Sequence, residues 1–222
     1  MGTITRSLAN NVTTGGVVTS SAINNSSVTS ITSFASISGG SGSWNILSTA
    51  TASSSASIEF TSNIDSTYNL YVLDWHGVAP ATDVQQLYIS FSTDGGSTYA
   101  APMVIHSLRE FNDEITPDSD VGFGTGGGGG GVTTSPISIT GTIGNDSDHS
   151  SAGQIWLANP SNTSLVKMVK ITTISNQASD FIWTGWMDGF INTTSAVNGI
   201  KLNAASGNLA VGNFRLYGID GV

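Results

Sequence analysis

The sequence predicts an all-β protein, a two-sheet antiparallel β-sandwich that is jelly-roll-like and carries an extended N-terminal arm. Apolar and polar residues alternate over residues 68–76 and again over 86–93, which is the pattern of half-buried strands. Turn-forming residues separate about nine such short segments, and no segment shows the mixed spacing of an amphipathic helix. Charged residues make up only 9% of the chain, so Ser, Thr, Asn and Gly must supply most of the polar surface. These residues favour turns and strands over helix interiors.

The first 43 residues are a separate compositional block, rich in Ser, Thr, Asn and Gly. We therefore expect an arm over residues 1–43 and a sandwich domain over 44–222. Four apolar residues of the arm recur at a spacing of three, namely Val28, Ile31, Phe34 and Ile37. This spacing suits an extended chain lying along a neighbour, and it predicts an arm that orders against another subunit. A chance pattern and a disordered leader are the alternatives.

Two strands and a turn form the centre of the domain. The inward faces are predicted to carry Tyr71, Leu73 and Trp75 from the first strand, and Leu87, Ile89 and Phe91 from the second. Pro80 has no amide hydrogen, so residues 77–83 are expected to be a loop. Asp94-Gly95 suits a tight turn, which predicts a hairpin whose second strand is residues 102–106.

The remaining strands are expected at 44–47, 57–60, 136–140, 154–158, 165–174, 180–188, 200–202 and 213–219. The last of these should pair near the first strand of the domain and fix the C-terminal end. Lys167 and Lys170 are expected to face water. Trp75 and Trp183 are expected in the core, whereas Trp156 and Trp186 fall on the opposite parity and are interface candidates.

Residues 109–135 are expected to form a long, mobile surface loop, because six consecutive glycines at 126–131 make ordering costly. Its carboxylates are hard oxygen ligands of the kind that Ca²⁺ prefers, and they make a candidate calcium site from Asp113, Glu114, Asp118 and Asp120. Asp146 and Asp148 form a smaller second set. Neither set has the spacing of the twelve-residue calcium loop, so a solvated acidic loop is the alternative.

Charge and composition narrow the function classes. The net charge is −9 with only six Lys and Arg residues, so nucleic acid is not an expected partner. No apolar run approaches the roughly 20 residues that span a bilayer, so no membrane association is expected. Three histidines, at 76, 106 and 149, lack the context of a Ser-His-Asp catalytic site, and no carboxylate pair is selected by spacing. We therefore expect no enzymatic activity.

Several short segments resemble virion structural proteins of tailed bacteriophages, of the marine or cyanophage type. The segments are 57–68, 80–83, 91–99 and 213–218, together with leader-like stretches at 4–13 and 20–24. The resemblance covers roughly residues 1–100 and 180–219. It implies an exposed β-sandwich module on the outer surface of the virion. It also implies the major capsid protein or another virion protein as partner.

The resemblance implies a capsid decoration or cement protein attached to the outside of the head, assembled as a symmetric homo-oligomer such as a trimer. The alternative is a tail-fibre or knob module that binds host surface glycans through exposed tryptophans, since aromatic faces stack on sugars. A depolymerase is a third reading. For Trp156 and Trp186, subunit packing is favoured over sugar binding, because aromatic residues are enriched at interfaces.

Overall fold

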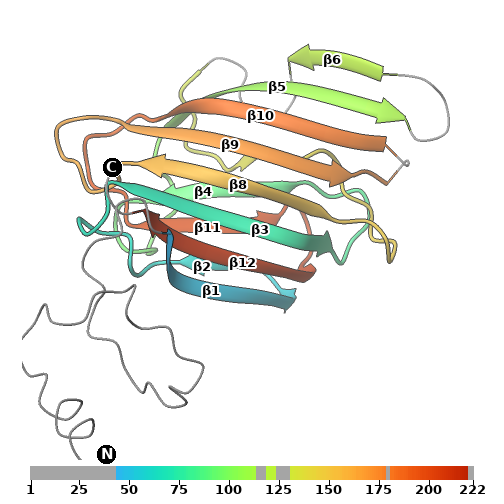
Figure 1. The fold of residues 1–222 in the computed structure, drawn as a ribbon, viewed down its shortest axis with the longest axis horizontal. Coiled ribbons are helices and arrows are strands. Elements are labelled where there is room, and N and C mark those ends of the chain that lie inside the picture. Colours follow the sequence, from blue (N-terminus) through green and yellow to red (C-terminus); the bar gives the residue numbers. More distant parts are fainter. Residues whose placement is uncertain (1–43, 114–118, 124–130, 179–180, 220–222) are drawn as a thin grey trace, which may run out of the picture. The chain divides into compact units, whose positions relative to one another are not determined.

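The computed structural model describes residues 44–113, 119–123, 131–178 and 181–219, which form the body shown in Figure 1. These residues contain twelve strands and no helix. The strands form two antiparallel sheets, which confirms the predicted all-β sandwich. Residues 1–43, which include the predicted arm, lie outside the described part of the chain.

The larger sheet has the strand order β1-β12-β3-β8-β9-β10-β5-β6, and the smaller has the order β2-β11-β4-β7. The strands are β1 (Trp44–Ser55), β2 (Ile58–Phe60), β3 (Leu70–Pro80), β4 (Leu87–Ser92), β5 (Met103–Asp113), β6 (Ser119–Phe123), β7 (Ile137–Ser138), β8 (Ser151–Ala158), β9 (Lys167–Asn176), β10 (Phe181–Ile191), β11 (Gly199–Ala204) and β12 (Leu209–Ile219). As predicted, the last strand lies beside the first, because β12 pairs with both β1 and β3.

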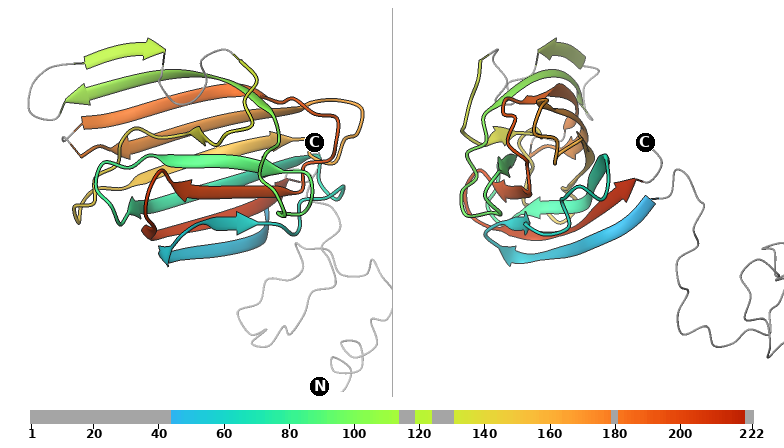
Figure 2. Two further views of the ribbon diagram at one scale, coloured as in Figure 1. Left: turned by 180° about the vertical axis from the view of Figure 1, so that it is seen from behind. Right: turned by 90° about the vertical axis from the view of Figure 1, so that its left-hand side faces the viewer.

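The chain alternates between the two sheets in the manner of a jelly roll. The set β1-β12-β3-β8 belongs to one sheet and the set β2-β11-β4-β7 to the other, and Figure 2 shows the two layers from behind and from the side. Two strand pairs are added to this arrangement, β5–β6 after β4 and β9–β10 after β8. Both additions extend the larger sheet on the side of β8.

The core lies between the sheets. Tyr71, Leu73, Trp75, Leu87, Ile89 and Phe91 are all no more than 2% exposed, which confirms the inward faces predicted from their alternation. Trp183 is also buried. An irregular segment around β7 adds Ile139 and Ile143 to the same buried cluster. Gly141 of this segment lies so close to Trp183 that an added Cβ would be 2.8 Å from the ring Cγ, so the segment covers the inner face of β10.

Two predictions about the central strands were wrong. Strand β3 continues through residues 77–80, because Gly77 adopts a φ of 60° and the register shifts between Trp75 and Val78. Pro80 ends the strand, so its missing amide removes no bond from the strand interior. The predicted hairpin is also absent: β4 pairs with β11 and β7, whereas β5 pairs with β10 in the other sheet.

The turn after β4 is nevertheless a strongly bonded one. Asp94 accepts hydrogen bonds from the Ser92 hydroxyl at 2.7 Å, the Thr98 amide at 2.8 Å and the Thr98 hydroxyl at 2.7 Å. These bonds, the Ser92 one first, lower the pKa of Asp94 to about 2. The Gly95 amide also donates to Asn198 Oδ1 at 2.8 Å. The turn is therefore tied to the start of β11, and it leads the chain across to the other sheet.

The stretch 109–135, which was predicted to be a loop, contains two strand segments in its described part. Residues 109–113 belong to β5 and residues 119–123 form β6, which pairs with it. Phe111 packs edge-on against Phe181, with ring centroids 5.6 Å apart. Glu110 alternates with this packed position and faces water, whereas Arg109 and Asp113 share the parity of Phe111 and are half-buried. Residues 114–118 and 124–130, with most of the glycine run, lie outside the described residues.

The prediction for Lys167 was wrong. Lys167 is fully buried, and its Nζ donates to the carbonyls of Leu165 and Thr193, each at 3.1 Å. It shares strand parity with the core residues Val169 and Ile171. Lys170 is exposed, as predicted.

Candidate functional site

The outer face of the larger sheet carries a second apolar cluster, separate from the core. Val72, Tyr217 and Ile219 point away from the sandwich interior, yet they are only 0%, 8% and 6% exposed. Leu70, Trp156 and Trp44 cover them from outside. Trp44 is the residue at which the described part of the chain begins. The Trp44 ring meets Trp156 at 5.5 Å and Tyr217 at 5.4 Å between centroids, in edge-to-face geometry.

Strand register brings these residues together from distant parts of the chain. Four neighbouring strands, β1, β12, β3 and β8, supply two adjacent rows of outward-facing side chains. One row is Trp44, Ile219, Leu70 and Ala158, and the other is Ile46, Tyr217, Val72 and Trp156. Every member of both rows is apolar or aromatic, so the rows form a continuous apolar surface.

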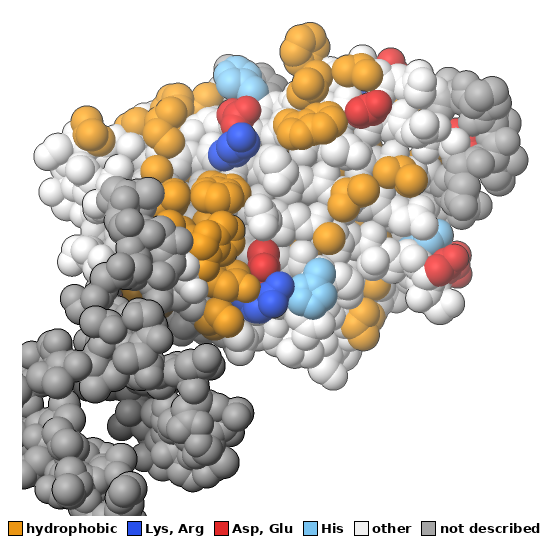
Figure 3. All heavy atoms as spheres, viewed as in Figure 1, with side chains coloured by type: hydrophobic (Ala, Val, Ile, Leu, Met, Phe, Trp, Pro, Cys, Tyr) orange, Lys and Arg blue, Asp and Glu red, His pale blue; other side chains and the backbone are white. Residues whose placement is uncertain are grey.

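We define the outer apolar patch as Trp44, Ile46, Leu70, Val72, Trp156, Met168, Tyr217 and Ile219. Figure 3 shows hydrophobic side chains gathered on the left of this face. Ile46 is 59% exposed, Met168 58% and Trp44 45%. A hollow of about 220 Å³ opens between Leu70, Trp156 and Met168, with Lys170 and Asp188 at its side. An exposed apolar cluster with a hollow and a charged rim is the usual form of a protein contact site.

A polar hollow adjoins the patch on the same face. The outer polar groove, as we define it, has a volume of about 620 Å³ and is lined by the polar residues Asp74, His76, Gln154, Thr172, Thr184 and Arg215, together with apolar residues such as Ile174. Arg215 donates to both carboxylate oxygens of Asp74 at 3.0 Å. This bidentate pair, first through its hydrogen bonds and then through its charge, raises the pKa of Arg215.

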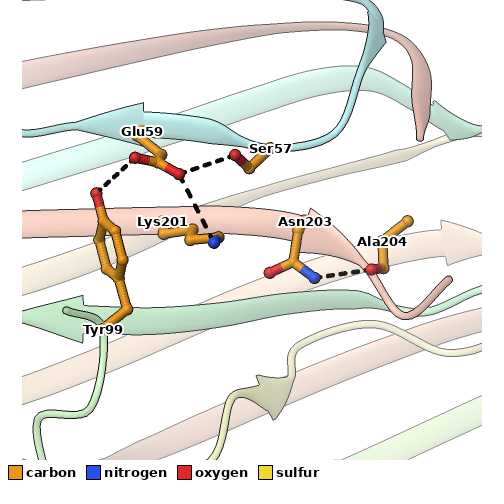
Figure 4. A network of polar contacts seen from close by, with 6 residues as sticks. All are labelled: Ser57, Glu59, Tyr99, Lys201, Asn203 and Ala204. Atoms are coloured by element: carbon orange, nitrogen blue, oxygen red, sulfur yellow. Dashed lines mark hydrogen bonds and ion pairs between the residues drawn. The ribbon is translucent and has the colours of Figure 1, made fainter. Parts of the chain in front are cut away.

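The smaller sheet presents a different surface. Glu59 accepts hydrogen bonds from Ser57 at 2.9 Å and from Tyr99 at 3.0 Å, and Lys201 lies 3.7 Å from it (Figure 4). Burial, followed by the bond to Glu59, raises the pKa of Tyr99. Lys201 Nζ also lies 5.2 Å from the Tyr99 ring centroid. The polar groups of this network bind to one another. None of them lines either of the two hollows described on the larger sheet.

The structure separates the two tryptophans predicted as interface residues. Trp156 is half-buried in the outer apolar patch, whereas Trp186 is 39% exposed and pairs across strands with Thr172 and Leu108. The four predicted arm residues Val28, Ile31, Phe34 and Ile37 lie outside the described residues. Sequence reasoning missed Tyr217 and Met168, and it considered Trp44 only as a possible sugar-stacking residue. The parity of residues 213–219 could have placed Tyr217 outward, but only strand register shows that it meets Trp44 and Trp156.

The calcium hypothesis stays a prediction. Glu114 and Asp118 lie outside the described residues, and Asp120 forms an ion pair with Arg109 at 3.8 Å. Among the described residues, no three metal-binding side chains lie close enough together to hold an ion.

The chain matches no family model, no curated protein and no solved structure. The described residues include no helix of the length and apolarity needed to cross a membrane.

Proposed function

We propose that this chain is a non-enzymatic structural protein of a tailed-bacteriophage virion, attached to the outside of the head as a decoration or cement protein. The outer apolar patch carries the proposal. Trp and Tyr are the side chains that dominate binding energy at protein interfaces. Here Trp156 lines a hollow and contacts Trp44, and Ile46 and Met168 of the same patch leave more than half of their surface in water. Covering a face of this kind with another protein is favourable, because it removes apolar surface from water.

The setting on a phage head draws on the sequence resemblance and fits the body of the molecule. A capsid presents many identical sites, so contacts that are individually modest hold firmly when copies are linked in a symmetric oligomer. The major capsid protein is the proposed partner of the outer apolar patch. The alternative, a tail-fibre or knob module that binds host glycans, draws on the outer polar groove instead.

The test is co-sedimentation of the purified protein with empty phage heads. Met168→Gln and Ile46→Gln place a polar amide where the patch meets the shell. Burying a side chain of this size contributes about 1.5–3 kcal/mol, so each change should weaken attachment by about 10- to 100-fold. Val211→Gln is the matched control, because Val211 is 54% exposed on the same strand as Tyr217 but at its other end.

Equal attachment of the patch variants and the control would contradict the proposal. The number of copies in intact particles gives an independent check. A number that matches the lattice of the head supports decoration, and a number that matches a tail fibre contradicts it.

A further inference from the structure

We propose that the outer polar groove is a binding site for a neutral carbohydrate, with Trp186 as the stacking surface at its rim. This site lies on the same face as the outer apolar patch but shares none of its residues. The inference therefore stands or falls separately from attachment to the head.

The hydrogen-bonding groups of the groove come from three neighbouring strands. Gln154 lies on β8, Thr172 on β9 and Thr184 on β10, and Gln154 and Thr172 are paired across strands. Within the described part of the chain, none of these three side chains forms a hydrogen bond with the protein. An amide and two hydroxyls can both donate and accept, and sugar hydroxyls do the same. The groove thus offers uncommitted partners of the type that a polyhydroxylated ring requires.

The charges of the groove favour a neutral ligand. Asp74 and Arg215 form a bidentate pair in which each charge offsets the other. Asp74 is mostly buried, whereas the Arg215 side chain is 42% exposed. The pair uses Nε and one Nη of the guanidinium, so the remaining N–H groups can donate to a hydroxyl. A net charge of −9 for the whole chain disfavours polyanions in addition.

Trp186 is not among the residues that line the groove, but strand register places it next to the lining residue Thr172, where it can supply an apolar face to a bound ring. Its side chain is outward-facing and 39% exposed, beside Thr172 in the next strand and two residues from Thr184 in its own. Within the described residues, its indole N–H has no hydrogen-bond partner. An aromatic ring with an apolar face and a polar edge suits the C–H face of a sugar ring and its hydroxyls. The groove volume of about 620 Å³ lies within the range of small-ligand sites.

The experiment is a titration of the full-length protein with a panel of neutral hexose oligosaccharides, followed by tryptophan fluorescence and calorimetry. Sialylated and sulfated oligosaccharides serve as comparators. Wild type should bind at least one neutral probe, and Trp186→Ala should weaken that binding by about tenfold or more. Gln154→Ala should weaken it to a smaller degree. Met168→Gln, an exposed change in the patch on the neighbouring part of β9, should bind as wild type does.

Binding to no neutral probe would overturn the inference, and so would binding only to the anionic comparators. Equal affinity of Trp186→Ala and wild type would also overturn it. Circular dichroism of each variant verifies that the fold is kept, and Trp186 is exposed enough for this to be expected. Loss of capsid attachment in Met168→Gln with intact sugar binding would separate the two sites.

Discussion

Lys167 shows how one residue can carry an electrostatic cost inside the fold. Its ammonium is buried and bonded to two carbonyls, and within the described residues it has no carboxylate partner. Burial penalises the charged form and lowers the pKa of Lys167 below its ordinary value of 10.5. Between the lowered pKa and 10.5, the unfolded chain therefore binds more protons at this site than the folded chain does. Stability from this residue should rise with pH across that window.

Lys167→Met should remove this pH dependence. The variant loses two hydrogen bonds but no longer buries a charge, and these two effects on the free energy of unfolding oppose each other. The test is therefore the slope of stability against pH, because stability at a single pH does not separate them. The measurement is urea unfolding at a series of pH values up to about 10.5. Lys170→Met is the control, because it removes the same charge from an exposed position of the same strand. A Lys167→Met slope equal to that of wild type would contradict the argument.

The burial of individual side chains was predicted correctly where strand parity and side-chain type agreed. Trp75 is flanked by Asp74 and His76, and Trp183 is followed by Thr184; both tryptophans are bulky, and both are in the core. The prediction failed at Lys167, because lysine usually faces water, although the parity of Val169 pointed inward. The outer apolar patch was only partly foreseen. Trp156 was identified, but its contact with Trp44 depends on the pairing of strands far apart in the sequence.

Gly189 sets how closely two strands of the extended sheet approach. It lies in β10 opposite β5, and an added Cβ would collide with the Val104 carbonyl oxygen and come within 2.7 Å of Ile105 Cα. Both contacts are with backbone atoms, which cannot move aside as a flexible side chain can. The glycine is therefore required by the spacing of the sheet.

Gly189→Ala should destabilise the protein by about 1–3 kcal/mol, the usual cost of overpacking. For a protein of this size, that corresponds to a fall in Tm of about 2–12 °C, measurable by differential scanning calorimetry. Gly122→Ala, in β6, is the matched control, because the nearest atom to its added Cβ is 3.7 Å away. A Tm for Gly189→Ala that matches the control would show that the strands separate freely.

The positions of the strands were predictable from the sequence, but the strands with which they pair were not. The alternation of residues 86–93 correctly located β4, whose core face carries Leu87, Ile89 and Phe91, although Ser90 and Ser92 on the opposite face are buried as well. The same pattern contains no information about which strand lies alongside. Residues 102–106 were therefore assigned to a hairpin with β4, whereas the Asp94 turn leads them to the other sheet. The extension of β3 to Pro80 was missed because it depends on the φ of one glycine, Gly77.

The whole sandwich is built from strands that lie between Trp44 and Ile219 and pair with one another. The jelly-roll-like class could be foreseen because about nine alternating segments with turns between them leave few other solutions. The two added strand pairs could not, since their sequences alternate as the others do.

Deleting residues 1–40 should leave the melting temperature of the sandwich close to that of the full chain, since no described strand pair is removed. The same deletion should weaken oligomer assembly or attachment to the head, because the spacing of Val28, Ile31, Phe34 and Ile37 suits contact with another subunit. Calorimetry and light scattering measure the two effects. An unchanged assembly state would contradict the role given to the arm. Loss of the unfolding transition would contradict the expectation that the sandwich folds without residues 1–40.

The antiparallel pairing of β1 with β12 places Trp44 directly opposite Ile219. Tension between these two points would act on the hydrogen bonds of the ladder one after another, as in opening a zipper, and not on all of them at once. A load passed through these two ends would peel the edge strand away at low force, while a load entering through the broad face would be shared by the whole sheet.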